Sequence, residues 1–184
     1  MSLDASAKIP MGTLIPSFCL SDPKGKSYKS DSLFGPQGLL VIFMTNYCPY
    51  AKAAWPRLVR IAKHAKCLGI STVVINPQAR LNDRYDSPKE MTAVIKINKI
   101  DFPYLLDEEQ RVARDFQAKC IPDVFLYDHT KILVYHGRID DSWKDEAKAT
   151  SLNLKFAVDA LAAGEPVERR QISSVGCSIK WRKS

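Results

Sequence analysis

A cysteine followed by a proline is the part of this sequence with the clearest chemical potential. Six apolar residues at 39–44 precede Cys48, and an apolar pattern with helical spacing begins at Pro49. Proline is favoured in the first turn of a helix, so Cys48 is predicted at the cap of a helix that leaves a buried strand. The unpaired N–H groups and the positive end of the helix dipole favour a thiolate there. We therefore expect Cys48 to be a nucleophile with a pKa below the ~8.5 of a free thiol.

A hydroxyl group lies close to this cysteine in the sequence. Thr45 stands three residues before Cys48. A hydroxyl at that spacing is able to donate a hydrogen bond to the thiolate or to orient a peroxide. The other interpretation is that Thr45 is only a polar residue at the end of the strand. The sequence leaves both interpretations open.

A further cysteine lies in the C-terminal segment at 176–181. Gly176 allows the backbone to approach another surface closely, and Ile179 and Trp181 offer apolar contacts. A fully exposed thiol in a cytosolic tail would be an oxidation liability. We therefore predict that residues 165–184 pack on the domain as a tail and bring Cys177 towards Cys48 as a resolving thiol. The alternative is a docked tail whose cysteine is only buried.

The elements that would position these residues follow from the apolar patterning. The run at 39–44 is typical of a strand buried on both faces. A second run at 70–76 comes after the helix that begins at Pro49, which predicts a βαβ unit with parallel strands. The other predicted elements are a short strand within 13–20, a surface loop over 77–87, a helix over 88–97, an extended segment over 102–106, a short helix over 108–116, a hairpin of strands 124–127 and 132–135, and a last helix over 152–161.

The turn that holds Cys48-Pro49-Tyr50 resembles the active-site turn of thioredoxin-like proteins. Ala51 stands where those proteins carry the second cysteine of a CxxC motif. The chain as a whole is similar to redoxin-type proteins, often described as alkyl-hydroperoxide-reductase or thiol-specific-antioxidant-like. Nearly the whole chain shares this resemblance, through the further motifs Pro16-Ser17-Phe18, Ile121-Pro122-Asp123 and Gly176-Cys177-Ser178-Ile179-Lys180-Trp181.

The resemblance implies an α/β, thioredoxin-like fold for residues 1–184 as a single domain. Its central mixed β-sheet would be flanked by helices, with a cis-proline before the β-hairpin. The Ile121–Pro122 bond would be cis, which costs only about 0.5–1 kcal/mol at an X–Pro bond, and would face Cys48. The backbone before the proline would then offer its N–H and C=O groups to an extended substrate. The implied substrate contacts are Pro49, Tyr50, Ile121 and Pro122.

The same fold would bring Cys120 near Cys48. Cys120 is then either a resolving thiol or a small buried residue. Because Ala51 cannot resolve an intermediate on Cys48, that role would fall to Cys120, to Cys177 or to an external thiol such as glutathione.

The likeness to peroxiredoxins is limited to the spacing of Thr45 and Cys48. Those proteins have a proline where this chain has Val41. Their catalytic arginine aligns with Val134, and Arg138 is close to that position but out of register.

Composition and charge exclude several other classes of protein. No run approaches the ~18 apolar residues of a membrane helix, and residues 1–10 contain no apolar segment typical of a secretory signal. The formal charge of +7 is scattered along the chain, so no nucleic-acid partner is expected. The five cysteines and three histidines show no metal-ligand spacing, and no cofactor is expected. Cys19, between Phe18 and Leu20, is predicted to be buried.

The sequence therefore predicts a cytoplasmic thiol-dependent oxidoreductase with Cys48 as its nucleophile. The thiolate would attack either a disulfide or a peroxide, so the expected partners are protein or small-molecule thiols and disulfides, or peroxides. The alternative is a binding protein that keeps the fold and has lost turnover with the missing CxxC. The oligomeric state does not follow from the sequence.

Overall fold

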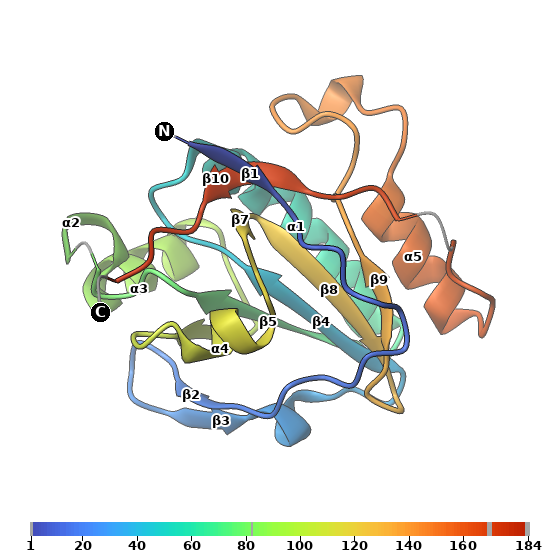
Figure 1. Cartoon of the computed structure of the whole chain (residues 1–184), viewed down its shortest axis with the longest axis horizontal. Helices are drawn as coiled ribbons and strands as arrows, with labels where there is room; N and C mark the ends of the chain where they lie inside the picture. The colour runs from blue at the N-terminus through green and yellow to red at the C-terminus, as the bar shows by residue number, and fades with distance from the viewer. Residues whose placement is uncertain (1, 82, 169–170, 183–184) are drawn as a thin grey trace.

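A seven-stranded mixed sheet forms the centre of the molecule (Figure 1). The computed structural model describes residues 2–81, 83–168 and 171–182. The central strand β4 (Gly38–Phe43) is buried along its whole length and pairs with parallel β5 (Ile70–Asn76) and antiparallel β8 (Asp123–Asp128). The strands lie in the order β3-β2-β6-β5-β4-β8-β9. The edge strands are β3 (Ser27–Lys29) and β9 (Leu133–His136), and β2 (Cys19–Ser21) and β6 (Tyr104–Leu106) lie between β3 and β5.

Helices cover both faces of this sheet. The long helix α1 (Pro49–Cys67) lies behind the sheet in Figure 1 and continues through Pro56 without a break. The short helix α4 (Arg111–Asp115) lies in front, and the Phe116 ring that follows it packs edge-on against Phe43 of β4. The other helices are α2 (Asp83–Asp86), α3 (Pro88–Ile97) and α5 (Asn153–Ala162), with 3-10 turns η1 (Ser30–Leu33) and η2 (Glu146–Lys148).

A second, three-stranded sheet joins both ends of the chain to the middle. Its strands lie in the order β1 (Leu3–Ala5), β10 (Val175–Ser178) and β7 (Cys120–Ile121), and both pairings are antiparallel. Figure 1 shows β10 between the N-terminal strand and the segment that leads into β8. No strand is predictable from the sequence at these three places, because two to four residues are too few for an alternating pattern to stand out.

A buried ion pair ties α1 to the loop after β9. The Arg57 guanidinium donates to Asp140 Oδ2 at 2.5 Å, and both side chains are almost fully buried. The same guanidinium donates to the backbone oxygens of Ser142, at 2.8 Å, and Trp143. The indole of Trp143 stacks on Tyr50, with ring centroids 4.0 Å apart. This loop is therefore fixed against the first turns of α1, beside Cys48.

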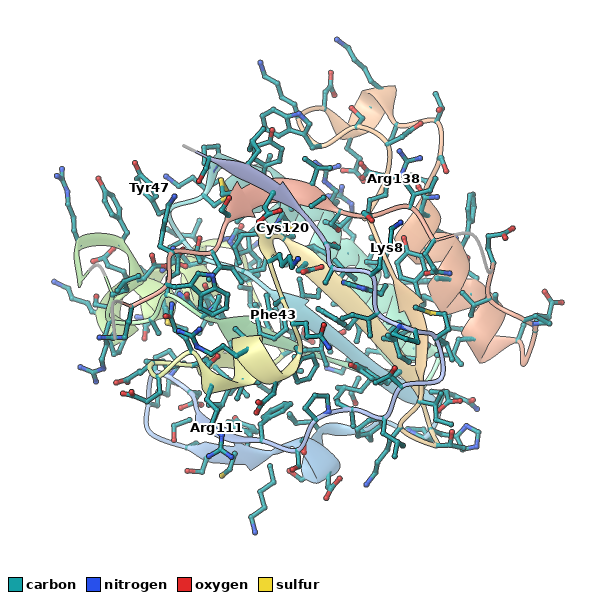
Figure 2. The ribbon with its side chains drawn as sticks, viewed as in Figure 1. Lys8, Phe43, Tyr47, Arg111, Cys120 and Arg138 are labelled. Carbon is teal, nitrogen blue, oxygen red and sulfur yellow. A yellow bond between two sulfur atoms is a disulfide. The ribbon has the colours of Figure 1, made fainter. Side chains whose placement is uncertain are left out.

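The predicted strand at 70–76 and helix at 88–97 are confirmed, with the same bounds. The predicted loop at 77–87 contains the short helix α2, and the strand expected within 13–20 is reduced to β2 at its end. The predicted burial of Cys19 is wrong, because this side chain is exposed. Neighbouring residues in extended chain point to opposite sides, and Phe18 takes the buried side. Figure 2 shows the contrast between an interior side chain, Phe43, and Arg111, which points outward.

Candidate active site

The N-terminus of α1 positions Cys48 in the way the sequence predicts. Cys48 is the N-cap residue, with an extended backbone, and Pro49 is the first helical residue. The carbonyl of Cys48 accepts the first hydrogen bond of the helix, from Lys52 N at 2.9 Å. Pro49 is exposed, whereas the Cys48 side chain is buried. The sulfur therefore lies inside the molecule at the end of the central strand.

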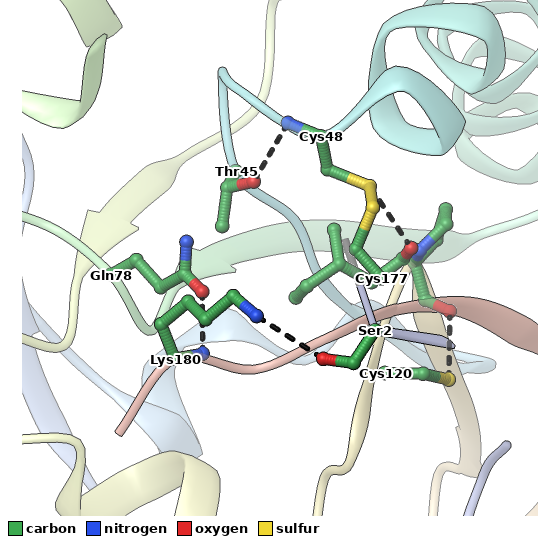
Figure 3. The surroundings of a disulfide bond; sticks show 9 residues. Ser2, Thr45, Cys48, Gln78, Cys120, Cys177 and Lys180 are labelled. Carbon is green, nitrogen blue, oxygen red and sulfur yellow. Dashed lines mark hydrogen bonds between the residues drawn. A yellow bond between two sulfur atoms is a disulfide. The ribbon is translucent and has the colours of Figure 1, made fainter. Parts of the chain in front are cut away.

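Cys48 and Cys177 form a disulfide bond (Figure 3). Their Cα atoms are 6.3 Å apart, although 129 positions separate them in the sequence. Cys177 comes from β10, so this strand lies against the domain and brings its sulfur to Cys48. Both cysteines are buried. Ala51, at the position of the missing CxxC cysteine, is buried in the core.

The Ile121–Pro122 peptide bond is cis and faces this disulfide. The carbonyl oxygen of Ile121 lies 3.5 Å from Cys48 Sγ. Beyond Pro122 a cavity of about 400 Å³ opens, with Tyr50 and Trp143 on its wall. Of the four implied substrate contacts, Tyr50 and Pro122 line this cavity, and Ile121 lines a second cavity together with the two cysteines. Pro49 is exposed at the end of the helix.

The Thr45 side chain is buried and holds the backbone of the active-site turn. Its hydroxyl accepts a hydrogen bond from Cys48 N at 3.4 Å. Thr45 also lines a cavity of about 260 Å³ together with Cys48, Cys177 and Lys180. Thr45 is therefore part of the wall of the space that a small reactant would enter next to the two sulfurs.

Cys120 lies near the disulfide in the chain fold, but its thiol points away from it (Figure 3). Its sulfur is 3.4 Å from Pro122 O, 3.7 Å from Ser6 Oγ and 3.8 Å from Ser174 O. Burial raises the pKa of the Cys120 thiol well above that of an ordinary cysteine. These contacts favour the interpretation of Cys120 as a small buried residue over that of a resolving thiol.

A buried polar cluster supports the cis-proline from below. Asp123 Oδ1 accepts a hydrogen bond from the Ser6 hydroxyl at 2.6 Å and lies 2.9 Å from His136 Nε2. Asp123 Oδ2 accepts from Lys119 N at 3.2 Å. The cluster joins the N-terminal segment, the cis-proline segment and β9. Sequence reasoning missed it, since its members lie far apart along the chain and belong to no motif as a group.

A second buried carboxylate lies beneath the turn that carries Cys48. Asp86 Oδ1 accepts hydrogen bonds from Asn46 N at 2.8 Å and from Asn76 Nδ2 at 2.9 Å. The Asn46 side chain in turn accepts from the Tyr104 hydroxyl at 3.0 Å. Asp86 lines the same 260 Å³ cavity as the two cysteines. Burial raises the pKa of its carboxyl above the ordinary value, although both hydrogen bonds oppose that rise.

This raised pKa predicts a specific pH dependence of stability. The unfolded chain loses the Asp86 proton first as the pH rises from the ordinary value of 3.8, so the free energy of unfolding falls until the higher pKa of the folded state is passed. Asp86→Asn keeps an acceptor oxygen and removes the titration. We expect its free energy of unfolding, minus that of the wild type, to increase across this pH range in urea titrations. A constant difference would contradict the assignment to Asp86.

No arginine at the described positions lines the 260 Å³ cavity that holds the two cysteines. Among the described residues, no group of three or more histidine, cysteine, aspartate or glutamate side chains is arranged to hold a metal ion. Arg138 lies in the 400 Å³ cavity beyond Pro122, where its Nε donates to Asn153 Oδ1 at 2.9 Å. In the described part of the chain, no helix is long and apolar enough to cross a membrane.

Comparisons with known proteins place these features in context. The sequence profile of the AhpC/TSA family matches residues 11–136. The thiol-disulfide oxidoreductase ResA of Bacillus subtilis (strain 168) is 26% identical over 118 residues, which are 64% of this chain and 62% of ResA. The aligned region thus spans less than two thirds of that relative.

Solved structures match the fold more completely. A conserved, uncharacterized protein from Geobacillus kaustophilus superposes with a TM-score of 0.94 and 34% identity, over 100% of this chain and 98% of its own. Peroxidoxin BcpB from Mycobacterium tuberculosis superposes with a TM-score of 0.58 and 17% identity, over 85% of this chain and 94% of its own. The expected thioredoxin-like α/β fold, a mixed sheet flanked by helices, is confirmed.

Proposed function

Because the chain belongs to the AhpC/TSA family, we propose that it is a thiol–disulfide oxidoreductase that alternates between a Cys48–Cys177 disulfide and a dithiol. The observation that carries this proposal is the disulfide itself, between the helix cap and the tail. A bond between two cysteines of which one caps α1 supplies both a nucleophile and a resolving thiol. The second cysteine of CxxC is then replaced by one from the other end of the chain.

The proposed reaction transfers two electrons to the substrate. The Cys48 thiolate attacks one sulfur of a substrate disulfide, and the other substrate sulfur leaves as a thiolate that takes a proton from water. The Cys177 thiolate then attacks Cys48 Sγ, so that the Cys48–Cys177 bond forms and the remaining substrate thiolate leaves. The substrate is reduced to two thiols and the protein is oxidised. A dithiol reductant then cleaves the Cys48–Cys177 bond by the same exchange, is itself oxidised to a disulfide, and restores the protein dithiol.

Thr45 supports a peroxide as a second candidate substrate. Thr45 lines the same cavity as Cys48, and its hydroxyl accepts a hydrogen bond from Cys48 N. Attack of the Cys48 thiolate on a peroxide would give a sulfenic acid and release an alcohol or water, and Cys177 would then displace water to form the same disulfide. Arg138, the nearest counterpart of the peroxiredoxin arginine, pairs with Asn153 instead. This position of Arg138 favours the disulfide substrate.

Mass spectrometry of the treated protein separates these candidates. One equivalent of oxidised glutathione is expected to convert the reduced chain to the Cys48–Cys177 form faster than one equivalent of hydrogen peroxide does. Proteolysis under acid should yield a peptide pair joined through Cys48 and Cys177. In Cys177→Ala, the glutathione adduct on Cys48 should accumulate.

Three results would argue against the proposal. A Cys48–Cys120 bridge would show that Cys120, and not Cys177, is the resolving thiol. A faster reaction with the peroxide would select the second candidate. A reduced protein that reacts with neither reagent would favour a thioredoxin-fold binding protein without turnover.

A further inference from the structure

The backbone of the tail strand that carries Cys177 is bonded along residues 119–121 and to two glutamine side chains, Gln78 and Gln110, which together we call the groove. In β10, Cys177 pairs with Ile121 and Ser178 pairs with Cys120, along the edge of the strand before the cis-proline. Beyond β10, Ile179 N donates to Lys119 O at 3.1 Å. The backbone of the tail is therefore bonded at the same edge that the cis-proline presents to the active site.

Two glutamine side chains extend this recognition past the end of β10. Gln78 Oε1 accepts from Lys180 N at 2.6 Å, as Figure 3 shows. Gln110 Nε2 donates to Lys180 O at 2.7 Å, and its Oε1 accepts from Arg182 N at 2.6 Å. Both glutamine side chains are buried. All three contacts are to main-chain atoms, so they would serve any extended segment in this position, whatever its side chains.

The groove nevertheless selects at the residue before the cysteine. A Cβ atom on Gly176 would lie 2.0 Å from the carbonyl oxygen of Ile121 and 2.6 Å from its carbonyl carbon. These neighbours are backbone atoms next to a proline and cannot swing aside like a flexible side chain. The position occupied by Gly176 therefore admits glycine and excludes residues with a side chain.

We propose that this groove is the docking site for an extended segment of a partner protein that carries a glycine followed by the reactive cysteine. The tail of the chain is the resident occupant, and the partner segment displaces it. This inference rests on the proposed function, since it assigns the substrate class of that same pair of cysteines. It also follows that the oxidised protein is closed, because the tail covers the docking edge while the Cys48–Cys177 bond holds it.

The exchange balances without another reactant. When the partner cysteine arrives as part of a disulfide, the reduced Cys48 thiolate attacks its sulfur and the far half of that disulfide leaves as a thiolate. The partner segment then occupies the groove, joined to Cys48. Return of the tail brings the Cys177 thiolate to Cys48 Sγ, which forms the intramolecular disulfide and releases the partner as a thiolate. The incoming and leaving segments use the same backbone contacts in turn.

The test uses the full-length Cys177→Ser variant and a synthetic peptide. The peptide has the sequence Ser-Val-Gly-Cys-Ser-Ile-Lys-Trp, with its cysteine joined to thionitrobenzoate, whose release is coloured. We expect this peptide to form the mixed disulfide with Cys48 roughly tenfold or more faster than the same peptide with alanine in place of glycine. The small disulfide dithiobis-nitrobenzoate is the control for the reactivity of Cys48, and mass spectrometry identifies each product.

A second pair of variants tests the role of the tail as occupant. Adding Gly176→Ala to the Cys177→Ser background is expected to loosen the tail and raise the rate with the glycine peptide several-fold. Adding Val175→Ala, which trims a half-exposed side chain of the same strand, is expected to leave that rate unchanged. Equal rates for the two peptides, with Cys48 reactive towards the small disulfide, would overturn the groove and leave the proposed function standing. A Cys48 that is unreactive towards all three reagents would overturn both.

Discussion

Replacement of Cys48 by serine is expected to lower the rate of disulfide exchange by on the order of 10³-fold or more, because a hydroxyl is not ionised near neutral pH and forms no disulfide. In the wild type the thiol at the cap of α1 is the sulfur that reaches both the cis-proline edge and Cys177. The measurement is the rate of release of thionitrobenzoate from its disulfide by the reduced protein, recorded against pH.

Cys67→Ser is the matched control for this variant. Cys67 is the last residue of the same helix and its side chain is exposed, so its loss removes a thiol without touching the site. The control should release thionitrobenzoate at the rate of the wild type and with the same pH profile. Release of thionitrobenzoate by Cys48→Ser at the rate of the wild type would show that another cysteine is the nucleophile.

Removal of the Asp140 carboxylate is expected to cost about 3–5 kcal/mol of the free energy of unfolding, the range found when one partner of a buried ion pair is deleted. Asp140→Ala leaves the Arg57 guanidinium buried in α1 without its counter-charge. Hydrogen bonds from Arg57 to the carbonyls of Ser142 and Trp143 remain, which places the expected cost towards the lower end. Urea titrations measure this loss as a lower midpoint of unfolding, with no change in the dependence of the free energy of unfolding on urea concentration.

The exposed pair of Lys66 and Asp101 provides the comparison. These side chains are 67% and 56% exposed, so Asp101→Ala should cost far less than Asp140→Ala. Similar losses for the two variants would mean that the burial of the Arg57–Asp140 pair has no energetic consequence. The loss of Asp140 should also move the Trp143 indole, which a fluorescence spectrum of the folded variant would report.

The central fold could be predicted from the sequence because its signals are local and strong. The runs at 39–44 and 70–76 are continuous and apolar, since parallel strands buried on both faces need no polar alternation. Cys48 with Pro49 is likewise a local signal for a helix cap. Within the site, the approach of Cys177 to Cys48 could be predicted, because Gly176 and Ile179 are unusual residues in a free terminus.

The rest of the site could not be predicted, because it depends on contacts between distant segments. Gln78 and Gln110 carry no local pattern, and their role appears only when the tail lies across both of them. Asp86 is ordinary in a polar loop, and folding places it under the Cys48 turn. The predicted burial of Cys19 is wrong because flanking apolar residues indicate that a segment is buried, and not that each of its side chains is.

The small sheet connects the N-terminal strand to the strand that carries Cys177. In the described sheets, β1 is an outer strand and β10 is its one partner. If a partner segment displaces β10 from the cis-proline edge, as we propose, β1 loses the strand with which it pairs, while Ser6 just beyond β1 remains bonded to Asp123. The pairing of the first residues of the chain therefore depends on the position of a strand that carries one of the two reactive sulfurs, more than 170 positions away in the sequence.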